Sequence, residues 1–329
     1  MKKLINDVDS VLSESLDGFA AAHSDIVTLG EASQFIRRRT LKRGKVALIS
    51  GGGSGHEPLH TGFVGHGMLD AACPGHVFTS PTPDQMMAAA TAVDTGAGVL
   101  FIVKNYSGDM MNFQMAAEML DRENDSVIIN DDVAVENSTY TTGRRGVAGT
   151  LLVERIVGAA AERGERLADL KALGDAVNKS TASMGVALTS CTVPAVGSPT
   201  FQIGVDEMEM GVGIHGEPGR RRVKLTSAEE IAAELTGAVL KDLSLKRGQD
   251  VFLLVNGFGG TPLMELYVMV NAANKVLAGA GVRAVRYLTG SYVTSLEMAG
   301  CSITVCAADP PMLALWDAPL HTPALRWGM

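Results

Sequence analysis

Residues 45–58, KVALISGGGSGHEP, decide the fold class of this 329-residue chain. The stretch opens with a short apolar run and passes directly into three consecutive glycines, Gly51 to Gly53. Two further apolar runs, each followed by polar residues, occupy 98–104 and 126–129. Runs that are apolar along their whole length are typical of strands buried on both faces of a parallel sheet. The pattern therefore indicates a parallel sheet in the first part of the chain.

Helical patterns separate these apolar runs. They cover 83–93, 110–120 and 145–163, and Thr82 is suited to cap the first of them. Strands that alternate with helices predict an N-terminal α/β domain with a parallel sheet between layers of helices. We place this domain at residues 1–180.

The rest of the chain follows a different pattern. Strands are expected at 184–193 and 208–215 with no helix between them. Ser227 and Glu230 form a capping-box pattern at the start of the next helix. Adjacent strands predict a C-terminal α/β domain with a mixed sheet at 181–329, and the apolar tail is expected to pack back on the first domain. The other elements expected in this half are strands at 250–256, 283–288 and 302–307 and helices at 227–240 and 262–277.

The composition limits the class of protein. Hydrophobic residues make up 46% of the chain, charged residues 19%, and the net charge is −8, as in ordinary soluble globular proteins. The arginine runs at 37–39 and 220–222 suit solvated loops better than a nucleic-acid surface, so no nucleic-acid partner is expected. Four cysteines without two close pairs do not predict a metal site. With no signal-peptide pattern and no run of about 18 apolar residues, we expect a cytoplasmic protein without membrane contact.

The glycine-rich stretch 51–58 carries the first candidate site. Glycines after a strand allow backbone N–H groups to approach a ligand closely. Their spacing matches neither the dinucleotide-binding pattern nor a P-loop. A ligand loop of another kind and a plain tight turn both remain open. His56 lies at the sheet edge where open α/β folds bind ligands, although a lone histidine is more often structural.

Two further stretches combine glycines with reactive side chains. In KNYSGD, residues 104–109, Lys104 and Asp109 can hydrogen-bond a polyol or form a surface ion pair. In GVGIHGEPG, residues 211–219, glycines flank His215, whose neutral imidazole can add to a carbonyl; the alternative is a turn histidine. The other histidines, His60 among them, have no polar partner at a telling spacing and are interpreted as structural.

Together these stretches resemble a known family. GGGSGHEP at 51–58, KNYSGD at 104–109 and GIHGEPG at 213–219 are similar to the motifs of the dihydroxyacetone kinase K family. FTSPTPDQ at 78–85 and LWDAPLHTPALRW at 315–327 resemble it too, and the likeness runs along nearly the whole chain. The resemblance implies two α/β domains and a cytoplasmic homodimer.

The resemblance also implies a substrate site. The ketose dihydroxyacetone would be held covalently as a hemiaminal on His215, an adduct that glycerol, which has no carbonyl, cannot form. Asp109 and His56 would hydrogen-bond its terminal hydroxyl, and one of them would take the proton. Lys104 would orient Asp109 or the substrate oxygens. The strand-end residues expected to contact the substrate are Gly53, Ser54 and Gly55.

The phosphoryl donor is expected on another protein. The sequence contains no P-loop and no clear set of magnesium carboxylates, Asp131 and Asp132 being the nearest candidate. We therefore expect no cofactor in this chain, and the resemblance implies ADP or ATP with magnesium on an L-type partner subunit. In the phosphotransferase-system form of the family, a phosphohistidine-carrying M-type subunit supplies the phosphate, and the product is dihydroxyacetone phosphate. The alternatives are a ketose-sensing transcriptional coactivator and a kinase subunit for a four-carbon ketose such as erythrulose.

Overall fold

The computed structural model describes residues 2–30, 34–134, 143–217 and 219–329. The chain forms two compact units. Unit 1 comprises Met1–Ile129, Thr150–Ala176 and Pro311–Met329, and unit 2 comprises Asn130–Gly149 and Val177–Pro310. The boundary expected near residue 180 lies close to the crossing at 176/177. The chain also crosses between the units at 129/130, 149/150 and 310/311, so neither unit is a single continuous segment.

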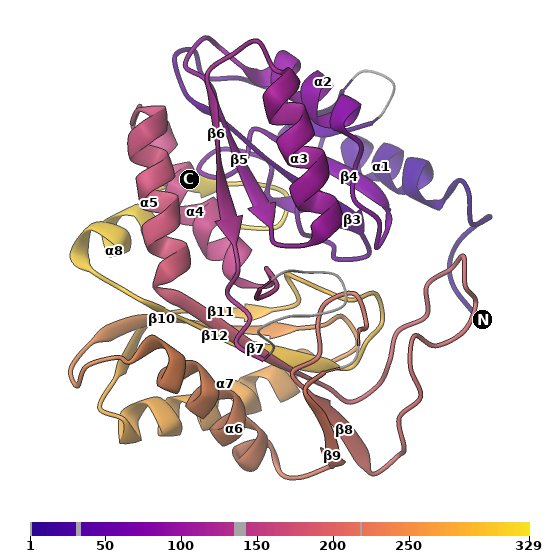
Figure 1. The fold of residues 1–329 in the computed structure, drawn as a ribbon, viewed down its shortest axis with the longest axis vertical. Coiled ribbons are helices and arrows are strands. Elements are labelled where there is room, and N and C mark those ends of the chain that lie inside the picture. Colours follow the sequence, from indigo (N-terminus) through magenta and orange to yellow (C-terminus); the bar gives the residue numbers. More distant parts are fainter. Residues whose placement is uncertain (1, 31–33, 135–142, 218) are drawn as a thin grey trace. The chain divides into compact units, whose positions relative to one another are not determined.

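Unit 1 contains the parallel sheet that the apolar runs predict (Figure 1). Four of its strands, β4, β3, β5 and β6, pair in parallel. Two short strands, β1 and β2, continue the sheet beyond β4 and pair antiparallel. The expected runs at 45–50, 98–104 and 126–129 correspond to β3, β5 and β6. In sheet order the strands are β1 (Val27–Leu29), β2 (Ile36–Arg38), β4 (Ala71–Val77), β3 (Ala47–Ser54), β5 (Val99–Lys104) and β6 (Asn124–Ile129).

Helices cover the sheet of unit 1. Buried residues of α2 (Pro83–Val93) and α3 (Ser107–Met119) pack in one apolar cluster with Ile49 and Phe101, which defines one covered face. Ser50 points to the opposite face because side chains alternate along a strand, and there it interacts with Glu154 of α4 (Gly149–Glu162). The remaining helices of this unit are α1 (Val11–Ala22), α5 (Leu167–Lys179) and α8 (Pro310–Trp316).

Helix α4 starts later than the sequence predicts. The expected helix begins at residue 145, whereas α4 begins at Gly149. The preceding residues are held by Asp131, whose carboxylate accepts the backbone N–H groups of Val147 at 2.8 Å and Gly149 at 2.7 Å. These bonds replace the helical hydrogen bonds of the predicted first turn.

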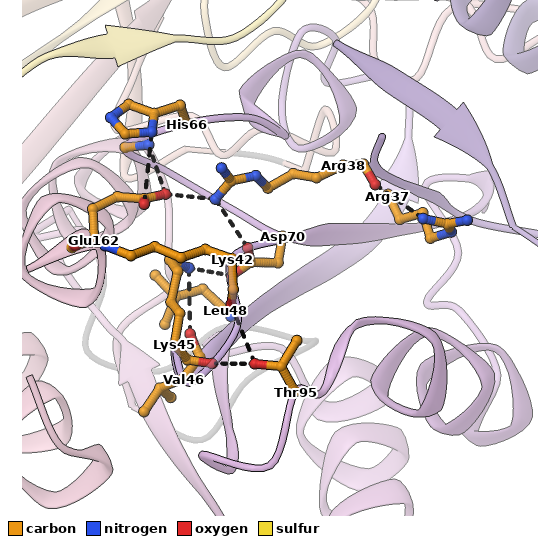
Figure 2. A network of polar contacts seen from close by, with 11 residues as sticks. Arg37, Arg38, Lys42, Lys45, Val46, Leu48, His66, Asp70, Thr95 and Glu162 are labelled. Carbon is orange, nitrogen blue, oxygen red and sulfur yellow. Dashed lines mark hydrogen bonds and ion pairs between the residues drawn. The ribbon is translucent and has the colours of Figure 1, made fainter. Parts of the chain in front are cut away.

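A buried ionic network stabilises the amino end of the unit 1 sheet (Figure 2). Arg38 Nη1 lies 2.5 Å from the Glu162 carboxylate and 3.2 Å from that of Asp70. Lys45 also binds Asp70, which accepts the Leu48 backbone N–H at 2.8 Å. The network connects the last turn of α4 to β2 and β3 at the edge opposite the glycine end of β3. It therefore fixes the scaffold on which the candidate site is built.

The chain's last segment belongs to unit 1. Arg155 of α4 is buried, and its guanidinium donates to the carbonyl oxygens of Trp316, at 2.7 Å, and Ala318. The same guanidinium lies 5.0 Å from the centre of the Trp327 ring, a cation–π arrangement. The segment also forms a small hairpin of β13 (Leu320–His321) and β14 (Arg326–Trp327).

Unit 2 is built on a mixed sheet, as expected. Only β10 and β11 pair in parallel, and the other neighbours are antiparallel. Helices α6 (Ala228–Leu243) and α7 (Leu263–Gly279) pack on one face around a single apolar cluster, and Ser227 and Glu230 form the predicted capping box (Figure 1). The strand order is β11 (Arg283–Gly290), β10 (Asp250–Gly257), β12 (Gly300–Ala307), β7 (Thr181–Ala187), β8 (Glu207–Met210) and β9 (Arg221–Lys224).

Two strands of unit 2 are shorter than predicted. The expected strand at 184–193 is β7, which ends at Ala187, and the one at 208–215 is β8, which ends at Met210. Gly211 follows with a φ of +76°, a left-handed conformation that a strand cannot continue. His215 therefore lies in a turn beyond the strand. None of the described helices is both long enough and apolar enough to span a membrane.

Candidate functional site

The glycines after residue 50 belong to the strand itself. The predicted strand ended at Ser50, but β3 continues through Gly51, Gly52 and Gly53 to Ser54. A Cβ at Gly53 would lie 2.5 Å from the Thr79 backbone nitrogen, so only glycine fits this close approach. The turn comes afterwards at Gly55, which has a φ of +102° and donates its N–H to the Glu57 carboxylate at 3.0 and 3.1 Å.

Ser54 and His56 are held tightly at this end of β3. The Ser54 hydroxyl donates to the Gly75 carbonyl at 2.7 Å, which ties the strand end to β4. His56 is 1% exposed and stacks on Phe78, with ring centres 5.2 Å apart and an interplanar angle of 21°. Both side chains are therefore fixed in position before any ligand arrives.

Lys104 and Asp109 lie together at the same edge of the sheet. Lys104 ends β5, and Asp109 lies in the first turn of α3. The Lys104 Nζ is 3.6 Å from the Asp109 Oδ2 and donates to the Gly51 carbonyl at 3.0 Å. Ser80 donates to the Asp109 Oδ1 at 2.5 Å. Both members of the pair are buried, so they do not form the surface ion pair that was the alternative.

His60 also belongs to this group, although no sequence pattern indicates it. Its Nε2 is 2.8 Å from the Lys104 Nζ, and its Nδ1 is 2.6 Å from the Glu154 Oε1. These partners are 44 and 94 residues away along the chain, so no local spacing announces them. Burial and the adjacent Lys104 charge lower the pKa of His60 well below its usual range, so the ring is neutral at physiological pH.

His215 has its own carboxylate in unit 2. Its backbone N–H donates to the Glu217 Oε2 at 2.8 Å, and its Nδ1 lies 3.8 Å from the Glu217 Oε1. Arg145 Nη1 is 3.4 Å from the same carboxylate, and the Arg145 guanidinium also binds Asp132 at 2.5 Å and the Gly211 carbonyl at 2.8 Å. Burial raises the pKa of Glu217, but His215 and Arg145 more than reverse this and lower the pKa to about 2. Glu217 is therefore anionic beside the imidazole.

The carboxylates of Asp131 and Asp132 bind other residues of this chain. Asp131 accepts the Ser183 hydroxyl at 2.5 Å in addition to its backbone N–H partners. Asp132 pairs with the buried Arg145. Within residues 2–30, 34–134, 143–217 and 219–329, no three histidine, cysteine or acidic side chains are arranged to hold a metal ion. The two aspartates are thus engaged in structural contacts.

Comparisons with known proteins show the family to which the chain belongs. The Dak1 domain model matches residues 17–324. The dihydroxyacetone-binding subunit DhaK of a PTS-dependent dihydroxyacetone kinase from Listeria innocua is 52% identical over 308 residues, 93% of this chain and 94% of its own. The corresponding subunit of the PEP-dependent kinase from Escherichia coli is 48% identical over the full length of both chains. The solved dihydroxyacetone kinase operon co-activator Dha-DhaQ superposes with a TM-score of 0.90 at 33% identity, covering 97% of this chain and 98% of the co-activator. The chain belongs to the Dak1 domain family, together with these dihydroxyacetone-binding kinase subunits.

Proposed function

We propose that this chain is the dihydroxyacetone-binding subunit of a dihydroxyacetone kinase. The observation that carries the proposal is the buried Lys104–Asp109 pair beside the glycine end of β3. A charged pair removed from water, next to backbone that only glycine allows, is suited to bind and activate a small polar molecule. The names of the most similar relatives supply the chemical class of that molecule.

His215 would anchor the ketose. Its Nδ1 faces the Glu217 carboxylate, an arrangement that favours the proton on Nδ1 and makes Nε2 the nitrogen that would add to the carbonyl carbon. Addition forms a C–N bond, the carbonyl oxygen gains a proton, and the ring loses its Nδ1 proton, so the hemiaminal is neutral overall. The anionic Glu217 would stabilise the positive ring that forms on the way. Glycerol cannot react in this way, so the adduct would provide selectivity that hydrogen bonds alone do not.

The unit 1 residues would act on the hydroxyl to be phosphorylated. Asp109, held at one oxygen by Ser80, or His56 would take the hydroxyl proton as the oxygen attacks phosphorus. Lys104 would orient Asp109 and the substrate oxygens. Gly53, Ser54 and Gly55 would contact the substrate at the end of β3. Fixing the substrate in place lowers the entropic cost of the reaction.

The donor would be a separate L-type subunit that carries ADP or ATP with magnesium. A phosphohistidine-carrying M-type subunit would recharge it, and dihydroxyacetone phosphate would be released in the cytoplasm. We expect this chain to act as a homodimer. A ketose-responsive coactivator is the second candidate, because a co-activator shares the fold at 33% identity over nearly its whole length.

A turnover assay tests these candidates. The chain is mixed with a nucleotide-carrying subunit, and product formation is followed on dihydroxyacetone and on erythrulose in parallel. Turnover supports the kinase, and the ratio of the two rates decides between the three-carbon and four-carbon ketose. Ketose binding by calorimetry without turnover would favour the coactivator and contradict the kinase.

The His215→Ala variant tests the anchor. The wild type is expected to bind dihydroxyacetone and not glycerol, whereas the variant should lose most of this preference because both molecules satisfy the remaining hydrogen bonds. Equal ratios of ketose to glycerol affinity in the two proteins would mean that His215 is a turn residue only.

A further inference from the structure

His60 and Glu154 form a polar chain behind the proposed site, outside the set of residues assigned to the substrate. Glu154, on α4, and His60, six residues after the end of β3, are 0% and 5% exposed. His60 contacts Glu154 through Nδ1 and Lys104 through Nε2. Each ring nitrogen therefore has one polar partner, and neither partner comes from solvent.

The direction of these hydrogen bonds follows from the donors available. A lysine ammonium can only donate, so the His60 Nε2 accepts from Lys104. A neutral ring that accepts at Nε2 carries its proton on Nδ1, which then donates to the Glu154 oxygen. Burial raises the pKa of Glu154 while Lys104 opposes this effect, but a carboxylate and a carboxylic acid both offer an accepting oxygen. The tautomer of His60 is thus fixed from both sides.

The ammonium of Lys104 is satisfied in the same way. It donates to the Gly51 carbonyl at 3.0 Å and to the His60 Nε2 at 2.8 Å, and it forms an ion pair with the Asp109 carboxylate at 3.6 Å. Two of these partners hold the ammonium within the protein, and the third is the group proposed to act on the substrate. Removing His60 as an acceptor would free the ammonium to rotate away from Asp109.

We propose that His60 and Glu154 are positioning residues that keep Lys104 cationic and directed at Asp109. The ion pair at 3.6 Å holds the Asp109 carboxylate in place for the role proposed above, in which it accepts a hydroxyl proton. The kinetic consequence rests on the proposed kinase function, but the hydrogen-bond polarity itself does not. The same polarity explains how a fully buried lysine is accommodated here, because two acceptors and one carboxylate lie around its ammonium.

A pH effect follows from this arrangement. The titratable groups that face Lys104 are Asp109 of α3, Glu154 of α4 and His60, and His56 bears on His60. Burial lowers the pKa of Lys104, while Asp109 and Glu154 oppose that effect. Activity that needs the cation is lost as the pH rises through the pKa of Lys104. Removing an acceptor lowers that pKa further, so the alkaline limb of the rate profile moves to lower pH.

Matched pairs of variants test the proposal. Glutamine at position 60 can accept from Lys104 and donate to Glu154, whereas leucine can do neither. His60→Leu should lower kcat by about 10- to 100-fold, as loss of such supporting partners does elsewhere, and His60→Gln should restore most of it. The alkaline limb should move down by about 1–2 pH units in His60→Leu and return in His60→Gln. Glu154→Leu should likewise lower kcat and move the alkaline limb down, and Glu154→Gln should restore most of both, because glutamine keeps an accepting oxygen.

Glu162→Gln is the control on the same helix. Glu162 is a half-buried carboxylate of the same helix, but it lies in the ionic network at the opposite edge of the sheet. The variant is expected to lose stability without a shift in the alkaline limb. A shift of equal size in Glu162→Gln would mean that the effect is a general consequence of disturbing α4, and would overturn the proposal.

Nitrogen NMR of labelled histidine, on the wild-type chain without substrate, separates this proposal from the kinase proposal. His60 is expected to carry its proton on Nδ1 at neutral pH. Protonation on Nε2, or equal kcat and pH profiles for His60→Leu and the wild type, would overturn the proposal that His60 and Glu154 position Lys104. A wild type with the expected tautomer but no turnover on any ketose would overturn the kinase function and leave the hydrogen-bond chain supported.

Discussion

Substituting Gly52 by alanine tests the packing behind the proposed site most directly. The backbone of Gly52 is not in the left-handed region, so alanine is tolerated by its conformation. The added Cβ, however, would lie 2.3 Å from the Lys104 Nζ and 3.3 Å from its Cε. The ammonium must move, and it then loses its bonds to the Gly51 carbonyl and to His60.

The size of the effect follows from those two bonds. Hydrogen bonds to a charged group contribute roughly 1.5–3 kcal/mol each, so two of them amount to roughly 3–6 kcal/mol. Lys104 is 0% exposed, and no solvent replaces the lost partners. The lower entropy of an unfolded chain with alanine offsets only about 0.4–1 kcal/mol. Gly52→Ala should therefore reduce the free energy of unfolding by several kcal/mol and weaken ketose binding.

Urea unfolding followed by tryptophan fluorescence is the appropriate assay. Both tryptophans of the chain, Trp316 and Trp327, belong to unit 1, so their emission reports on the unit that contains Gly52. Gly18→Ala is the control in the same unit, because a Cβ at this position of α1 meets no atom within 4 Å. It should be neutral or stabilising by up to about 1 kcal/mol. A Gly52→Ala variant as stable as this control would refute the claim that Lys104 is held in place.

Three further outcomes are expected. Asp109→Asn should keep ketose affinity by calorimetry within a few fold but lose about 10²- to 10⁴-fold in turnover, and turnover close to wild type would rule out an acid–base role. Because the pKa of Glu217 is lowered to about 2, its carboxylate stabilises the fold above about pH 4.5, and this contribution is lost as the pH falls toward 2. The free energy of unfolding of Glu217→Gln should thus lie about 3 kcal/mol below that of the wild type at neutral pH, with the gap closing in acid; a gap independent of pH would contradict the assignment. Burial raises the pKa of all four cysteine thiols, so a thiol reagent should label them slowly in the folded chain and completely after unfolding. Rapid labelling of the folded chain would contradict the burial of Cys73, Cys191, Cys301 and Cys306.

The parallel sheet was predictable because three of its parallel strands contain short apolar runs. Residues 98–104 correspond to β5, which is buried along its whole length, and residues 126–129 lie in β6, the strand at the edge of the sheet. The short strands β1 and β2 and the strand β4 escaped prediction. β4 contains Pro74 and Gly75 and ends beside His76, a composition that has no strand pattern of its own. Its pairing with β3 and β2 determines its conformation.

The candidate site was predictable only in part. Lys104 and Asp109 follow a strand and flank a helix start, so their proximity can be inferred from the chain itself. His60 depends on Glu154, which is 94 residues later, and no local pattern connects them. Glu217 is next but one to His215, yet its importance comes from Arg145, which is distant in sequence and fully buried. The partners of these buried charges are set by the fold and lie far away in the sequence, so no local sequence pattern predicts the pairs.

The return of the chain to unit 1 has a consequence for synthesis. Residues of Pro311–Met329 are the last in this sequence to leave the ribosome, but they belong to the unit in which the chain begins. Until they emerge, Arg155 lacks the carbonyl oxygens of Trp316 and Ala318 that it binds in the finished structure. Domains usually mature in the order in which they are translated. Here unit 2 has all of its residues first, so the glycine-strand unit, although begun earlier, would be the later of the two to mature.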